Sequence, residues 1–178
     1  VNSDVDKLII EDITIEIFEN NFLSDIQFVE KFNVANQPSI LSKSGFDLYP
    51  YKSNFFDGLQ DNLTFYIEVY NSDQLENNRF LLNTYIQGYQ NEVIYKDSYS
   101  SKRMKAEQIV PHLQTYNISS LQKGNYSLVC EVRDVKNNLI DKKIKFFQRN
   151  KEKINLQSQN QLNKEFITID NKDTLRKY

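Results

Sequence analysis

The chain has 178 residues, of which 26% are charged, and its formal net charge at pH 7 is −2. This length suits one domain, or one and a half, and allows a real hydrophobic core. The near-neutral charge and the scattered lysines argue against a nucleic-acid-binding protein. No apolar run approaches the roughly 20 residues that a membrane-spanning helix needs. The aromatic content of 13% is all Phe and Tyr, and together with many Ile and Val it favours β-strands.

The first predicted strand covers residues 6–18 (DKLIIEDITIEIF). This pattern places Ile9, Ile13, Ile15 and Ile17 on one face, and its period of two is typical of a strand, here with a bulge expected near Glu11–Asp12. Residues 20–60 are less regular, because prolines, glycines and Asn-rich turns interrupt them. We expect short strands and ordered loops here, held by apolar anchors: Phe28, Phe32, Ile40, Phe46, Leu48 and Phe55.

The middle of the chain alternates more clearly. Residues 62–71 (NLTFYIEVYN) predict a strand, and residues 79–88 predict the next one. Residues 91–99 are expected to pair with 79–88 through a turn at Gly88–Asn91. The polar stretch 100–112, which contains a proline, is expected to be a loop or a short helical turn. The inward positions of the strand at 62–71 are Leu63, Phe65, Ile67 and Val69. Alternation resumes over residues 113–121 through Leu113, Tyr116 and Ile118.

Residues 121–147 (LQKGNYSLVCEVRDVKNNLIDKKIKFF) predict a β-hairpin. The first strand places Tyr126, Leu128, Cys130 and Val132 on one face, and Asn137–Asn138 suit a tight turn. The lead-in has the Leu-x-x-Gly-x-Tyr spacing of a tyrosine corner, in which the Tyr hydroxyl bonds to backbone a few residues upstream. The returning strand is expected to place Ile140, Ile144 and Phe146 inward, with its lysines outward.

About seven strands at roughly ten-residue spacing predict an all-β fold, an antiparallel immunoglobulin-like β-sandwich. We assign it to residues 5–149. Residues 150–178 are polar and rich in Gln and Asn, and they are interpreted as a linker or tail, which in a longer protein would lead to a further module.

The sequence offers little for catalysis or metal binding. Cys130 and His112 are the sole cysteine and histidine, and Cys130 lies on the apolar face of its strand, where a thiol behaves as a small hydrophobe. One His and one Cys do not make a zinc site. Asp73, Glu76 and Asp134 are oxygen ligands of the kind that calcium prefers, but their stretches are interpreted as turns. No catalytic residue, metal or cofactor is expected.

Tyrosines are the most informative candidates for a binding site. Tyr66, Tyr70 and Tyr85 occupy the outward positions of their strands, as do Tyr89 and Tyr95 further along. Such tyrosines form a partner-binding or sugar-stacking surface, or else they are covered by a loop on the second face of the sheet. The covered arrangement is the favoured interpretation.

Three stretches in this order resemble a known family. These are KLIIEDITI near the start, NLTFYIEVYN in the middle and LQKGNYSLVCEVRDVKNNLIDKKIKFFQR at the end. They are similar to the β-sandwich region of Bacteroidota GWxTD-domain proteins, in which an lxFYxExYN strand precedes an LxxGxYxLxVxVxD hairpin. The resemblance covers about residues 7–149, and the GWxTD motif itself is absent from this sequence.

The resemblance implies an exported cell-envelope protein, periplasmic or associated with the outer membrane, with no catalytic residue set to carry over. The sequence starts at Val1 without a basic and apolar leader, so we expect a removed signal peptide or a longer parent chain. The leading hypothesis is a non-enzymatic interaction or structural module that binds an envelope protein through an edge strand or the tail. The alternatives are a carbohydrate-binding module that uses the outward tyrosines and an ancillary domain of a larger enzyme.

Overall fold

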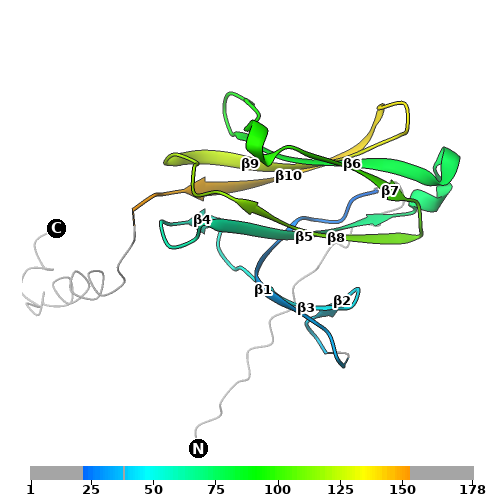
Figure 1. The fold of residues 1–178 in the computed structure, drawn as a ribbon, viewed down its shortest axis with the longest axis horizontal. Coiled ribbons are helices and arrows are strands. Elements are labelled where there is room, and N and C mark those ends of the chain that lie inside the picture. The colour runs from blue at the N-terminus through cyan, green and yellow to red at the C-terminus, as the bar shows by residue number, and fades with distance from the viewer. Residues whose placement is uncertain (1–21, 38, 153–178) are drawn as a thin grey trace, which may run out of the picture.

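The computed structural model describes residues 22–37 and 39–152, and it confirms the all-β class. Two sheets of five strands pack face to face, in the orders β2-β3-β1-β5-β8 and β4-β10-β9-β6-β7 (Figure 1). The strands are β1 (Gln27–Val34), β2 (Ser42–Lys43), β3 (Phe46–Pro50), β4 (Phe55–Phe56), β5 (Asn62–Tyr70), β6 (Arg79–Gly88), β7 (Ser100–Lys105), β8 (Ile109–Asn117), β9 (Gly124–Arg133) and β10 (Leu139–Arg149). All neighbouring strands are antiparallel except β4 and β10. The strand expected at residues 6–18 lies outside the described residues.

The core lies between the two sheets, where alternate residues of each strand meet. On β5, the residues predicted to face inward are all buried in the main cluster, and β6 has the bounds that the sequence predicts. Phe28, Phe56 and Phe147 come from three separate strands and meet edge to face, with ring centroids 5.5–6.2 Å apart. Burial of one such ring contributes about 1.5–3 kcal/mol, and the edge-to-face pairs add to it.

The partner of β6 is not the one that the sequence predicts. Residues 91–99 form a loop with a single bridge, Gln87–Ile94, and a 3₁₀ turn at Lys96–Ser98. One edge of β6 pairs with β9, and the strand on its other edge is β7, which lies within the stretch expected to be a loop. β7 reads as polar because it is the edge strand of its sheet and is mostly exposed. Pro111 lies within β8, also an edge strand, and edges are where sheets admit proline.

The hairpin of β9 and β10 carries the predicted tyrosine corner. The Tyr126 hydroxyl donates to the Gln122 carbonyl at 2.8 Å, and Asn137 takes a positive φ of 70° in the turn. The inward face predicted for β10 is correct at Ile140, which packs against the core, but wrong further along the strand, where Phe147 is fully buried and Ile144 is 55% exposed. An irregularity in the β9–β10 register between Leu139 and Asp141 shifts the alternation, so Phe147 takes the core position.

Arg149 fixes the far end of β10 to the loop that joins β4 and β5. Its buried guanidinium donates to the carbonyls of Asp57 and Gln60, the latter at 2.6 Å, and pairs with Asp61 at 3.6 Å. Gly58 also donates its N–H to the Glu152 carbonyl, at 3.1 Å. A side chain at position 58 would collide with the Lys151 carbonyl, because a Cβ would lie 2.2 Å from that oxygen.

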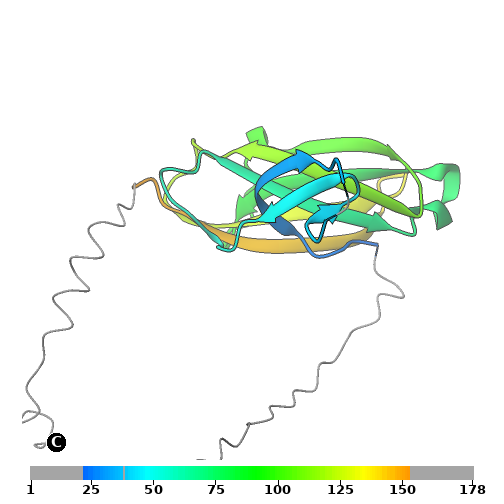
Figure 2. The same ribbon diagram turned by 90° about the horizontal axis from the view of Figure 1, so that it is seen from below.

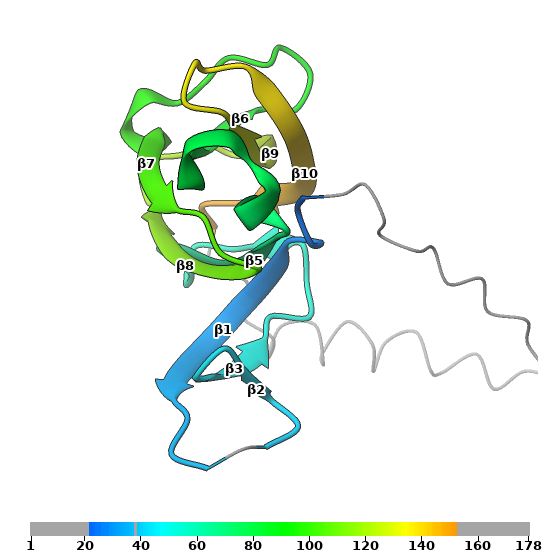
Figure 3. The same ribbon diagram turned by 90° about the vertical axis from the view of Figure 1, so that its right-hand side faces the viewer.

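A β-arm stands away from the sandwich, as Figure 3 shows. We define it as residues 30–37 and 39–50, which contain β2, β3 and the second half of β1. β1 pairs with β5 only through Gln27–Val29, and beyond this point it pairs only with β3. The arm therefore has solvent on both sides over most of its length. Among the described residues, no helix is long and apolar enough to cross a membrane.

Candidate functional site

The three tyrosines singled out from the sequence do not form one surface. Tyr66 and Tyr70 lie on β5, whereas Tyr85 lies on β6 in the opposite sheet. All three face away from the space between the sheets. Tyr66 is nevertheless only 2% exposed, because Val29 of β1 and Leu48 of β3 pack over it. Tyr85 is 6% exposed, and its ring stacks against Tyr99 at 5.9 Å. The rings of Tyr66 and Tyr85 are therefore not open to a ligand.

Tyr66 and Tyr70 instead hold a carboxylate. Both hydroxyls donate to Glu68, with a distance of 2.5 Å from Tyr66, and Ser44 adds a weaker bond at 3.3 Å. Burial disfavours the charged form of Glu68, but the hydrogen bonds from Tyr66 and Tyr70 outweigh it and lower the pKa of this carboxyl. Burial, followed by the bond to Glu68, raises the pKa of Tyr70 to about 12. These hydrogen bonds connect β5 to Ser44 of the β-arm, so the cluster stabilises the contact between the two elements.

Tyr85 forms a similar cluster on the other sheet. Its hydroxyl donates to Glu131 Oε1 at 2.8 Å, and Arg133 Nε donates to Glu131 Oε2 at 2.8 Å. Burial opposes the charge of Glu131, but the bonds from Arg133 and Tyr85 lower the pKa of this carboxyl. Cross-strand partners therefore satisfy the carboxylate, which leaves it little capacity for proton transfer near neutral pH.

Cys130 and His112 are both buried in the space between the sheets. Burial raises the pKa of the Cys130 thiol, so the nucleophilic thiolate is not populated at neutral pH. The His112 ring bonds through Nε2 to Gln114 Oε1 at 2.9 Å, and burial lowers the pKa of the imidazole. Both side chains act as parts of the core.

The acidic residues considered for calcium lie in turns. Asp73 and Glu76 belong to the two 3₁₀ turns after β5. Asp134 accepts the N–H groups of Lys136 and Asn138, each at 2.8 Å, and so organises the β9–β10 turn. In the part of the chain that the structure describes, no group of three or more His, Cys, Asp or Glu side chains is placed to hold a metal ion.

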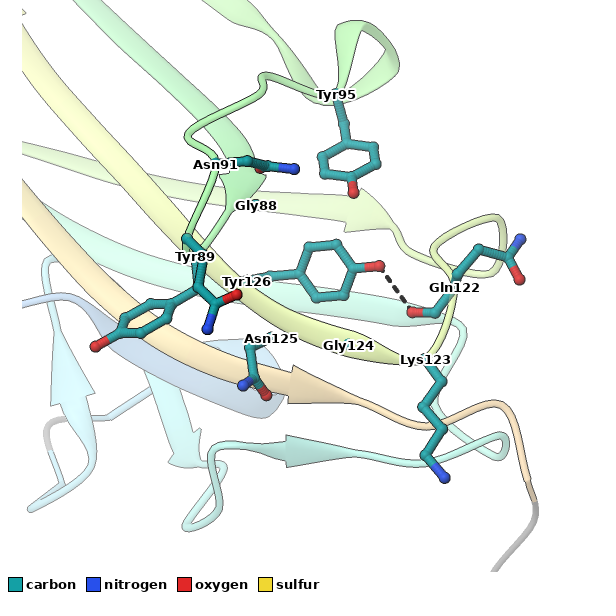
Figure 4. A pocket seen from close by; sticks show the side chains of 10 residues that line it. Gly88, Tyr89, Asn91, Tyr95, Gln122, Lys123, Gly124, Asn125 and Tyr126 are labelled. Atoms are coloured by element: carbon teal, nitrogen blue, oxygen red, sulfur yellow. Dashed lines mark hydrogen bonds between the residues drawn. The ribbon is translucent and has the colours of Figure 1, made fainter.

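A pocket of about 320 Å³ lies where the loops after β6 and before β9 meet (Figure 4). We call it the loop pocket. Tyr95 and Tyr126 meet edge to face inside it with ring centroids 5.4 Å apart, and the Tyr126 hydroxyl is held by the Gln122 carbonyl. Tyr89 lies at its rim, half exposed, and packs on Phe146 at 5.0 Å. The lining is Gly88, Tyr89, Gln90, Asn91, Tyr95, Gln122, Lys123, Gly124, Asn125 and Tyr126.

The loop pocket owes its shape to local backbone geometry. Asn91 folds back over Gly88, where its side-chain oxygen accepts the Val93 N–H at 3.1 Å. A Cβ at position 88 would lie 2.1 Å from that oxygen, so any larger residue there would displace the Asn91 side chain from this position. The amides that line the pocket were not predicted, because Asn91 and Asn125 are far apart in the sequence. The sequence does predict Tyr89 and Tyr95 as candidate binding residues, because both are expected to be outward tyrosines.

The apolar face of the β-arm is the other candidate surface. Phe32 pairs with Leu48 and Val34 with Phe46, so the four side chains share one face, and the rings of Phe32 and Phe46 meet at 6.2 Å. The inner end of this face is covered, since Leu48 is buried. Towards the tip it is open: Val34 is 70% exposed, and Ile40 beyond it is fully exposed. The sequence marked Phe32 and Ile40 as anchors, but the arm leaves them in solvent.

Both surfaces belong to the β-sandwich described above. Comparison with protein-family models and with curated proteins found no match for this chain.

Proposed function

We propose that this chain is a non-enzymatic binding module that recognises another protein through the β-arm. The observation that carries the proposal is the apolar face on which the exposed Phe32 and Val34 lie beside the half-buried Phe46, on an element that projects from the sandwich. Single exposed apolar residues are normal, but a contiguous apolar face is characteristic of an interaction site. The opposite face is polar, with Lys31 lying 4.4 Å over the Tyr49 ring, so the arm has one preferred side for a partner.

The cellular setting of this proposal rests on the resemblance to Bacteroidota GWxTD-domain proteins. That resemblance supports an exported protein in the periplasm or at the outer membrane, and an envelope protein as the partner. The short edge strand β2 supports a contribution from backbone pairing as well, since its outer edge is open in the described structure.

The experiment is a crosslinking pull-down from Bacteroidota envelope extracts, with the full chain as bait. We expect the double variant Phe32→Ser, Val34→Ser to lower recovery of the captured protein at least tenfold. The matched control is Lys31→Ser, Asn33→Ser, which alters the other face of the same strand. Equal recovery by the two double variants would contradict a role for the apolar face.

A second candidate function is glycan binding at the loop pocket. The supporting observation is the combination of the half-exposed Tyr89 ring with amide side chains around one hollow. Aromatic rings stack on sugar faces, while amides bond to hydroxyls. On a glycan array followed by calorimetry, Tyr89→Ala should abolish binding, and Tyr99→Ala, at an exposed tyrosine outside the pocket, should not. Failure of the unmodified protein to bind any glycan would eliminate this function.

A further inference from the structure

β10 has an edge that is almost entirely open. β9 pairs with one side of it from Leu139 to Arg149, but on the other side β4 reaches only Gln148 and Arg149. There the N–H of Gln148 donates to Asn54 and that of Asn150 to Phe56, at 2.7 and 2.8 Å. The same alternation directs the N–H groups of Ile144 and Phe146 towards the open edge. Within residues 22–37 and 39–152, no strand covers this stretch.

The chemistry of this edge differs between its two faces. On the outer face, Ile144 is more than half exposed and lies two residues from Phe146. On the inner face, Lys143 lies 3.6 Å from Asp25, and Lys145 lies 5.1 Å over the Phe28 ring. An occupant of the edge therefore meets apolar side chains on one face and ammonium groups on the other. A long strand edge of this kind invites pairing with another strand.

The first described residues of the chain, Phe22 and Leu23, lie beside this edge. The N–H groups of Phe22 and Leu23 both donate to Asp141 Oδ2, at 2.9 and 2.8 Å, near the start of β10. From here, contacts of Leu23 with Asp141, Asp25 with Lys143 and Phe28 with Lys145 show that this segment runs in the same direction as β10. A segment that precedes Phe22 and turns back over residues 19–21 would run antiparallel to β10. Asn20 and Asn21 are residues that such a turn favours.

The sequence before Phe22 matches both faces of the edge. Ile13, Ile15 and Ile17 alternate with Asp12 and Glu16. In one strand these sets point to opposite faces, so isoleucines would lie beside Ile144 and Phe146 while carboxylates lie beside Lys143 and Lys145. Residues 12–18 and 141–147 are of equal length, roughly 24 Å when extended.

We propose that residues 12–18 pair as an antiparallel strand with the open edge of β10 in the same molecule. The occupant is thus this chain's own N-terminal segment, and the added strand closes the edge and covers Ile144. The inference does not depend on the β-arm proposal, because it concerns the opposite sheet and different residues.

Amide hydrogen exchange on the full chain tests the pairing. The N–H groups of Ile144 and Phe146 should exchange slowly in the unmodified protein and at least tenfold faster in Ile15→Pro, which removes a donor and disrupts the strand. Ile154→Pro is the matched control in the other terminal segment and should leave both rates unchanged. Fast exchange in the unmodified protein, or equal rates in Ile15→Pro, would overturn the proposal.

Cysteine pairs identify which molecule supplies the strand. Ile144→Cys is combined in turn with Ile13→Cys, Ile15→Cys or Ile17→Cys, and with Thr14→Cys as the control on the opposite face. The native Cys130 is buried and does not compete. We expect mild oxidation to close a disulfide within the monomer for at least one isoleucine position and not for Thr14. Disulfide-linked dimers would mean that a second copy supplies the strand, and no disulfide with any isoleucine position would mean that the edge has another occupant; either result overturns the proposal.

Discussion

At the scale of single residues, His112 makes the stability of the fold depend on pH. Burial lowers the pKa of its imidazole, and the nearby charge of Lys102 acts in the same direction, although the bond to Gln114 Oε1 opposes both. The unfolded chain therefore binds a proton more readily than the folded one. Stability is complete above the unfolded pKa of about 6.5 and falls as the pH drops towards the lower folded value.

We expect the free energy of unfolding, measured by urea titration, to decrease from pH 7.5 to pH 5.5. In His112→Gln the decrease over this range should disappear. Glu68 and Glu131 act in a separate, more acidic window, because their pKa values are lowered and their contributions are lost below about 4.5. An unchanged pH dependence in the His112→Gln variant would contradict this assignment.

Tyr126 shows what a local motif can predict about a single residue. The Leu-x-x-Gly-x-Tyr spacing predicts a hydroxyl bond to backbone, and the 2.8 Å bond to the Gln122 carbonyl confirms it. Tyr126→Phe keeps the buried ring but removes this bond, so it should destabilise the fold by about 1 kcal/mol. The melting temperature should fall by roughly 2–4 °C in Tyr126→Phe. Tyr89→Phe, at an exposed tyrosine, should leave the melting temperature unchanged.

A local sequence pattern does not predict the burial of Tyr66. Alternation along residues 62–71 correctly turns this side chain away from the space between the sheets. What covers it comes from β1 and β3, and their packing depends on a β-arm that no period in residues 20–60 indicates. A sequence pattern assigns the face of a strand, but distant contacts decide whether that face is exposed.

At the scale of elements, predictions are correct where a local sequence pattern decides the structure and wrong where distant contacts decide it. β5, β6 and β9 are central in their sheets, so one face of each is apolar and its period of two is plain. β7 is an edge strand with no strongly apolar face, so its polar sequence predicts a loop although the residues form a strand. On β10, an irregular register near Asp141 reverses the alternation. Edges and bulges depend on pairing partners, which a single strand's sequence does not encode.

Phe147 tests the corrected alternation of β10. It is fully buried between Phe28, Phe56 and Tyr126, so Phe147→Ala should cost about 3–5 kcal/mol through lost contacts and a cavity. Ile109→Ala, at a half-exposed position on β8, should cost less than 1 kcal/mol. Chemical denaturation measures both values. Similar costs for the two variants would be incompatible with a core position for Phe147.

At the scale of the whole molecule, the packing of the sandwich is largely separate from that of the β-arm. The large core lies between the sheets, whereas the arm contributes Leu48 and the half-buried Phe46 to the small cluster around Val29 and Tyr66. Under the proposed function, we expect changes at the arm's exposed face to lower recovery of the partner while leaving the melting temperature nearly constant. Such separation lets the arm's sequence vary without loss of the fold.

The attachment of the chain at the two ends of β10 also has a mechanical consequence. Phe22 is held beside Asp141 at one end, and Glu152 is bonded to Gly58 at the other, so the ribbon begins and ends at opposite ends of the sandwich (Figure 2). A force applied through these two points pulls β10 along its own axis against β9. The ladder of hydrogen bonds then resists in shear, and many bonds must break together. In single-molecule pulling, we expect one high-force rupture rather than gradual peeling of β10 from β9.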